Sequence, residues 1–245
     1  MGFQSVFKRH EIKYVLSTAQ KERLLLLMRA HMSPDPYGHS TIRNLYFDTP
    51  HYRLVRRSLE RPAYKEKLRI RSYARIGEGD TAFVELKKKY DGVVYKRRLA
   101  LPLREAMAWT CEGACHPPHT QIVAEVDYFL RYYGTLRPVV YLSYERDAFY
   151  GLADKGFRVT FDENILARRE ELTLDSDPYG TPLLPAGSVL MEVKCAGGMP
   201  LWLVDFLTRE RLYKTSFSKY GRAFYELILP HIRLKEEKFD VSGNF

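Results

Sequence analysis

The segment Tyr64-Lys65-Glu66-Lys67-Leu68-Arg69-Ile70-Arg71-Ser72-Tyr73 alternates between charged and apolar side chains. Successive side chains of a β-strand point to opposite faces, so the segment is predicted to be a strand with a row of cations on one face. That row consists of Lys65, Lys67, Arg69 and Arg71, while Leu68 and Ile70 line the other face. A solvated surface strand of an antiparallel sheet would show the same alternation. The rest of the chain must therefore decide between a surface strand and a shared site.

The same alternation recurs in several other segments, which place cations, in some cases with a carboxylate, opposite an apolar face. The charged residues in phase within these segments are Glu11, Lys13, Glu85, Lys87, Lys96, Arg98, Arg146, Arg158, Glu192 and Lys194. About eight strands, mostly antiparallel, are predicted, over residues 7–16, 41–47, 64–73, 81–89, 93–101, 139–149, 157–162 and 189–195. In 93–101 both faces carry a cation, so the sequence leaves its inward face open.

Helices are predicted between and after these strands. Ser17 and Gln20 resemble a capping box, which begins a Leu-rich helix that extends to Ala30. The segment 33–38 contains two prolines and a glycine and is predicted to be a loop. Further helices are predicted over residues 51–59, 102–109, 120–133, 200–213 and 218–229.

Composition limits the kind of partner. The 245 residues include 39 Lys and Arg against 30 Asp and Glu, a formal net charge of +9, which favours an anionic partner such as polyphosphate, nucleic acid or nucleotide. No apolar run approaches the roughly 18 residues of a membrane span, and the N-terminus lacks the pattern of a signal peptide. Three cysteines suit a reducing compartment. We therefore expect a cytoplasmic protein with one domain over residues 1–234 and a charged tail over 235–245.

The strands could form an open sheet whose cations face water, or a barrel whose apolar outside is covered by helices. The carboxylates in phase with the cations distinguish the two arrangements. On a nucleic-acid surface Glu11, Glu85 and Glu192 would repel phosphate, whereas in a lumen they could hold a divalent metal among phosphates. The sequence thus favours an α+β fold: an eight-stranded antiparallel β-barrel with helices packed outside, in which the cations converge.

The order of short motifs resembles that of a known family. The motifs are Arg9-His10-Glu11-Ile12-Lys13-Tyr14, Tyr46-Phe47-Asp48-Thr49, Lys67-Leu68-Arg69-Ile70-Arg71, Glu85-Leu86-Lys87, Tyr144-Glu145-Arg146, Arg158-Val159-Thr160-Phe161-Asp162, Met191-Glu192-Val193-Lys194 and Ser218-Lys219-Tyr220. They resemble the VTC domain, the catalytic domain of vacuolar transporter chaperone polyphosphate polymerases, in the triphosphate tunnel metalloenzyme (CYTH-like) superfamily. The resemblance covers residues 5 to 230.

The resemblance implies transfer of a phosphoryl group from ATP or another nucleoside triphosphate onto a polyphosphate chain, with Mn²⁺ or Mg²⁺ as cofactor. With the strand parity, it assigns the catalytic cations Lys13, Arg69, Arg71, Lys87, Arg146 and Arg158. Further phosphate-binding residues are Lys67, Lys96, Lys194, Ser218 and Lys219. The metal ligands are Glu192, Glu85 and Glu11. The expected partners are the nucleotide and polyphosphate, pyrophosphate or phosphate; no nucleic acid is expected, and a membrane partner is compatible with the resemblance.

Two other functions remain open at this point. Triphosphatases of the superfamily begin with a Glu-x-Glu-x-Lys pattern, and Arg9 stands here in place of the first acid. This departure disfavours a metal-dependent triphosphatase without excluding it. The other alternative is a non-catalytic module that binds polyphosphate or another anionic polymer.

Overall fold

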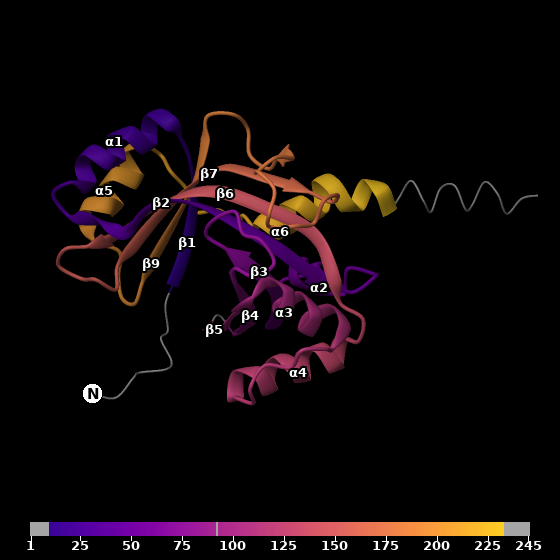
Figure 1. The fold of residues 1–245 in the computed structure, drawn as a ribbon. Helices are drawn as coiled ribbons and strands as arrows, with labels where there is room; N and C mark the ends of the chain where they lie inside the picture. The colour runs from indigo at the N-terminus through magenta and orange to yellow at the C-terminus, as the bar shows by residue number, and fades with distance from the viewer. Residues whose placement is uncertain (1–9, 92, 233–245) are drawn as a thin grey trace, which may run out of the picture.

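The computed structural model describes residues 10–91 and 93–232, and its fold is drawn in Figure 1. One antiparallel sheet contains nine strands in these residues, in the order β1-β9-β7-β6-β2-β3-β4-β5, with β8 paired to β7 beside this path. The strands are β1 (His10–Ser17), β2 (Met32–Asp48), β3 (Tyr64–Ser72), β4 (Thr81–Tyr90), β5 (Val93–Pro102), β6 (Arg137–Gly151), β7 (Arg158–Arg168), β8 (Thr181–Pro182) and β9 (Ser188–Cys195). The predicted α+β class and antiparallel sheet are confirmed. The tail predicted for 235–245 lies outside the described residues.

The sheet curls without closing, which corrects the expectation of a closed barrel. Strands β1 and β5 are its two edges, and no ladder joins them in the part of the chain that the structure describes. The segment before the last helices occupies the free edge of β1, since the backbone N–H of Thr215 donates to the carbonyl of Lys13 at 2.7 Å. A side-chain contact nevertheless spans the two ends of the sheet, because Lys87 Nζ on β4 lies 3.7 Å from Glu11 Oε2 on β1.

The helices follow the predicted order. They are α1 (Thr18–Met28), α2 (Arg53–Leu59), α3 (Leu103–Met107), η1 (Ala108–Glu112), α4 (Gln121–Tyr133), α5 (Leu201–Arg209), α6 (Lys219–Ala223) and η2 (Phe224–Ile228). The capping box is present, because Ser17 Oγ accepts from the N–H of Gln20 and Gln20 Oε1 accepts from the N–H of Ser17. The predicted loop at 33–38 is instead an irregularity inside β2, whose pairing with β6 shifts between Pro34 and His39.

Most helices cover the apolar face of the sheet. Helices α3, η1 and α4 bury Leu68 and Leu86 of β3 and β4, and α1 and α5 bury Met191 of β9. Helix α6 with η2 is the exception, because the ring of Tyr220 stacks on that of Tyr46 of β2 at 4.8 Å between centroids, on the opposite face. The expectation that all helices pack outside is therefore corrected: one end of the concave side is filled by the C-terminal helical segment. No helix in the described residues combines the length and apolar character needed to cross a membrane.

Candidate functional site

The strand register places the predicted charged residues on one face of the sheet. Residues directly opposite each other in an antiparallel pair point to the same side. Lys13 lies opposite Glu192, Arg146 opposite Asp162, and Arg69 opposite Glu85. Following such pairs across the sheet assigns one face, here called the inner face, to Glu11, Lys13, Lys67, Arg69, Arg71, Glu85, Lys87, Lys96, Arg146, Arg158, Glu192 and Lys194.

The two remaining predicted residues reach the inner face from the start of α6. Ser218 is the N-cap of this helix, and its hydroxyl oxygen accepts from Lys67 Nζ at 3.1 Å. Lys219 is buried and contacts two carboxylates of the inner face, Asp162 and Glu192. The structure thus brings all the predicted site residues to one side of the sheet.

One cluster is centred on Glu192, which is 6% exposed. Its Oε1 lies 3.0 Å from Lys13 Nζ and 3.3 Å from Lys219 Nζ, and its Oε2 lies 3.2 Å from Arg146 Nη2. The fully buried Asp162 shares the same Arg146 and Lys219. Burial alone would raise the pKa of Glu192, but the charges of Lys219, Lys13 and Arg146 outweigh it and hold the pKa well below its ordinary value.

A second cluster is centred on Glu85, which is 1% exposed. Lys96 Nζ lies 2.7 Å from its Oε1, and Arg98 Nε donates to the same oxygen at 2.7 Å. Arg69 Nη2 lies 2.7 Å and Arg71 Nη1 3.8 Å from its Oε2. Burial would raise the pKa of Glu85, but these cations lower it far below the ordinary value. Both oxygens of Glu85 are therefore committed to cations.

Other lysines of the inner face have no carboxylate partner. Neither Lys67 nor Lys194 forms an ion pair with any residue in the described ranges. Burial, together with the charge of Lys87, lowers the pKa of Lys67 to about 8, although Tyr46 opposes this shift. Burial likewise lowers the pKa of Lys194, and it lowers that of Lys96 to about 8 despite the nearby Glu85. An anion on this face would relieve the crowding of positive charge.

The predicted metal ligands divide into two groups. No three Asp, Glu, His or Cys side chains of the described residues are grouped so that they could hold a metal ion by themselves. Magnesium bound to phosphates commonly uses only one or two carboxylates. Lys13 Nζ contacts both Glu11 and Glu192, at 3.5 and 3.0 Å, so these two carboxylates lie close together, and Lys219 and Arg146 also contact Glu192. Glu85 shares none of its four cations with a second carboxylate in the described residues.

Arg158 is less available than the other cations. It is the first residue of β7, and its side chain is 41% exposed. Its Nη2 donates to the carboxylate of Asp35. Asp35 belongs to the irregular part of β2, so a segment that was predicted to be a loop supplies the counter-charge for a predicted phosphate-binding residue.

Sequence reasoning missed several members of the site. Asp162 and Arg98 have the parity of the predicted residues Arg158 and Lys96, so strand alternation could have identified both. Tyr46 and Tyr144 lie on the same face and accept hydrogen bonds through their hydroxyl oxygens, Tyr46 from Arg69 at 2.9 Å and Tyr144 from Arg71 at 3.1 Å. The two hydroxyls fix the guanidinium groups.

The inward face of β5, which the sequence left open, is now assigned. Lys96 points to Glu85, while Arg97 Nε lies 3.0 Å from Glu125 Oε1 of α4 on the outer face. Lys88 of β4 also contacts Glu125, at 3.6 Å. These two outer cations are structural partners of α4 and not members of the site.

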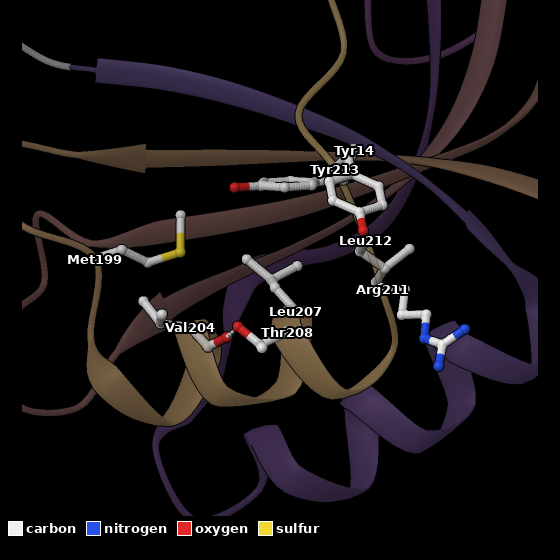
Figure 2. A pocket seen from close by; sticks show the side chains of 8 residues that line it. All are labelled: Tyr14, Met199, Val204, Leu207, Thr208, Arg211, Leu212 and Tyr213. Atoms are coloured by element: carbon white, nitrogen blue, oxygen red, sulfur yellow. Dashed lines mark hydrogen bonds between the residues drawn. The ribbon is translucent and has the colours of Figure 1, made fainter.

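A pocket on the outer face is separate from this site. Figure 2 shows side chains of α5 and the following segment around it, together with Tyr14 of β1. Its lining is Tyr14, Met199, Val204, Leu207, Thr208, Arg211, Leu212 and Tyr213. Tyr14 and Lys13 are adjacent on one strand, so their side chains lie on opposite faces of the sheet. With Arg211 as its one cation, this pocket does not suit a polyanion.

Comparisons with known proteins agree with the fold. The VTC domain family matches residues 8–228. A solved structure of a putative adenylate cyclase from Bacillus halodurans superposes with a TM-score of 0.51 at 16% identity, covering 87% of this chain and 94% of that one. One from Vibrio parahaemolyticus, with the same description, gives a TM-score of 0.47 at 12% identity, covering 89% and 98%. No curated protein matches the chain in sequence. Because the family match spans most of the chain, the chain belongs to the VTC domain family.

Proposed function

We propose that this chain is a polyphosphate polymerase that transfers the terminal phosphoryl group of ATP, or of another nucleoside triphosphate, onto a growing polyphosphate chain. One observation carries the proposal: a single concave face gathers buried and half-buried cations from both halves of the sheet, and two of the half-buried ones, Lys67 and Lys194, have no carboxylate partner in the described residues. A linear chain of phosphates supplies negative charge at regular intervals along such a face. Membership of the VTC domain family supports the same reaction.

The residue types suit phosphoryl transfer. This reaction depends on positioning and on neutralising charge around the transferred group, so it needs no covalent nucleophile from the protein. Arg69 and Arg71 are held by tyrosine hydroxyls and by Glu85, which leaves their remaining N–H groups to bind phosphate oxygens. Lys13, Lys87 and Lys194 line the opposite part of the face. A triphosphate would therefore meet cations along its whole length.

A divalent metal completes the proposed site. Glu192 and Glu11 would hold Mn²⁺ or Mg²⁺, which would supply positive charge to neutralise the phosphates of the substrate. Glu192 has the low pKa that a metal ligand needs at neutral pH. Glu85 is assigned a different role, as the fixed counter-charge that lets four cations pack together on one face.

The test is product analysis with purified protein. The protein is incubated with ATP and Mn²⁺ or Mg²⁺, with a chelator as control, and polyphosphate and free phosphate are measured separately. Metal-dependent polymer formation is the expected result. Free phosphate without polymer would identify a triphosphatase. Tight binding of polyphosphate without turnover of any nucleotide would identify a binding module.

The proposal also includes one domain over residues 1–234 and a cytoplasmic location. The three free cysteines support the cytoplasmic location.

A further inference from the structure

A row of unpaired cations leads away from the candidate site. Most cations at the centre of the inner face pair with Glu85, Glu192 or Asp162, but Lys65, Lys67 and Lys89, like Lys194, pair with no carboxylate in the described residues. Lys65 lies directly opposite Lys89, and the next inward pair along the same two strands is Lys67 opposite Lys87. Like charges opposite each other destabilise a sheet. Two consecutive pairs of this kind therefore indicate a place where an anion is bound.

The row continues from β3 onto α2. Lys65 Nζ lies 3.5 Å from the carbonyl oxygen of Ser58 in the last turn of this helix. Burial and the charges of Lys89 and Arg61 lower the pKa of Lys65. Lys65 thus connects the end of the inner face, where it lies opposite Lys89, to the end of α2, where it contacts Ser58.

Helix α2 presents arginines to solvent. Arg53, Arg56 and Arg57 are exposed, whereas Leu54 and Val55 are buried. Residues at spacings of three and four share one side of a helix, so Arg53, Arg56 and Arg57 form a stripe on α2, and Arg61 follows in the segment after the helix. None of the four forms an ion pair with a residue in 10–91 or 93–232. Exposed carboxylates are sparse here: Glu60 follows α2 and Asp91 follows β4.

The aromatic residues beside this stripe favour a polyphosphate over a nucleic acid. The guanidinium of Arg53 lies 5.6 Å from the ring centroid of Tyr132 and 5.5 Å from that of Tyr133. Tyr128 stacks on Tyr132 at 6.2 Å between centroids. Nucleic-acid bases stack on free aromatic faces, whereas the rings of Tyr132 and Tyr133 already contact the guanidinium of Arg53 and a neighbouring tyrosine.

We infer that Lys65, Lys89 and the arginines at positions 53, 56, 57 and 61 form an exit track along which a linear polyphosphate chain leaves the inner face. The inference rests on the proposed function for the identity of the polymer. Its geometry rests on the opposed lysines, on the contact between Lys65 and Ser58, and on the arginine stripe of α2. A short phosphate chain would occupy the inner face alone, while a long chain would also contact the exit track.

The test compares long-chain polyphosphate with tripolyphosphate. One variant carries Arg53→Gln, Arg56→Gln, Arg57→Gln and Arg61→Gln. The matched control carries Arg29→Gln, Arg104→Gln, Lys155→Gln and Arg209→Gln, which removes the same charge from exposed positions away from the exit track. Binding of both ligands is measured by titration at several salt concentrations without metal. Thermal melting establishes that both variants are folded.

The track variant should bind long-chain polyphosphate about tenfold more weakly than the control variant, while both bind tripolyphosphate like the parent. For DNA, each phosphate contact contributes about 0.7–0.9 to the slope of log K against log salt, so the loss of four contacts should reduce the long-chain slope by about three. Equal losses in the two variants would overturn the inference, and so would a matching loss of tripolyphosphate affinity. An equal loss for single-stranded DNA would assign the surface to nucleic acid instead. If the parent protein binds long polyphosphate through these arginines but makes no polymer, the exit track is supported and the proposed polymerase function is refuted.

Discussion

Glu85→Gln should destabilise the protein strongly in the absence of an anion. Removing one partner from a buried charge cluster costs about 3–5 kcal/mol, because the remaining charges stay buried without compensation. Glu85 is 1% exposed and is the one carboxylate shared by Arg69, Arg71, Lys96 and Arg98 among the described residues. In a chain of this size, 1 kcal/mol shifts the melting temperature by about 2–4 °C, so the melting temperature should fall by roughly 10 °C.

Anion binding should respond in the opposite direction. The variant leaves four cations without a counter-charge, so tripolyphosphate should bind it more tightly than the parent. A tenfold tighter dissociation constant adds about 1.4 kcal/mol of stabilisation at a saturating ligand concentration. Thermal melting with and without tripolyphosphate measures both effects.

Glu125→Gln is the matched control. Glu125 also pairs with two cations, Arg97 and Lys88, but on the outer face and with a 19% exposed side chain. Its replacement should cost about 1 kcal/mol, and tripolyphosphate should not restore it. If Glu85→Gln loses no more stability than this control, or gains no extra stabilisation from tripolyphosphate, Glu85 is not the counter-charge of the cluster.

The pH dependence of this effect has a definite sign. The folded state lowers the pKa of Glu85 below that of the unfolded chain, about 4.3 for a free glutamate. The stabilisation by its carboxylate is therefore fully present above that value and is lost as the pH falls toward the folded pKa. The difference in stability between the parent and Glu85→Gln should accordingly shrink in acid, as measured by denaturant unfolding at a series of pH values.

Three further perturbations test other parts of the site. Lys67 and Lys96 have pKa values lowered to about 8, so both lose charge as the pH rises through 8. The affinity for tripolyphosphate should therefore fall over that range. In the double variant Lys67→Arg with Lys96→Arg, the affinity should depend less on pH. Asp35→Asn removes the ion pair of Arg158 and should raise the affinity for tripolyphosphate several-fold, as measured by calorimetry. The double variant Asp35→Asn with Arg158→Ala should not show this increase. Asp48 accepts hydrogen bonds at the start of α2 and from the Tyr220 hydroxyl of α6, so Asp48→Ala should lower the free energy of unfolding by about 1–3 kcal/mol; an unchanged denaturation midpoint would show that α6 is held otherwise.

The inner face could be predicted from the sequence because side-chain alternation is a local property of a strand. Once Lys67, Arg69 and Arg71 are placed on a strand, they must share a face whatever that strand pairs with. The same holds for Lys13 with Glu11 and for Glu192 with Lys194. The register of the sheet then joins these separate faces into one.

Non-local features could not be predicted in this way. Whether β1 pairs with β5 depends on contacts between segments far apart in the sequence, such as the hydrogen bond from the backbone N–H of Thr215 to the carbonyl of Lys13 at the edge of β1. The placement of α6 on the inner face depends on the stacking of Tyr220 against Tyr46, which are far apart in sequence. Periodicity indicates that a helix is amphipathic but not which side of the sheet it covers.

The roles of the carboxylates also required the structure. The sequence assigned Glu85 and Glu192 alike to a metal, since both are acids in phase with cations. Their surroundings differ: Glu85 shares none of its four cations with another carboxylate in the described residues, whereas Glu192 shares Lys13 with Glu11 and shares Arg146 and Lys219 with Asp162. Which cations surround an acid depends on strand register and on side chains from several strands, and neither is visible in a local pattern.

The most direct test of the central claim is to measure metal-dependent turnover of ATP and tripolyphosphate affinity together in Glu192→Gln and Arg69→Ala. If Glu192 holds the metal during phosphoryl transfer, Glu192→Gln should lose about a hundredfold in turnover, on the order of 3 kcal/mol, while its affinity for tripolyphosphate stays equal or improves. Arg69→Ala should lose turnover and affinity together, because its charge contacts phosphate in both the ground state and the transition state. Full turnover by Glu192→Gln would contradict the assignment of the metal, and unchanged tripolyphosphate affinity in Arg69→Ala would contradict the inner face as the phosphate-binding site.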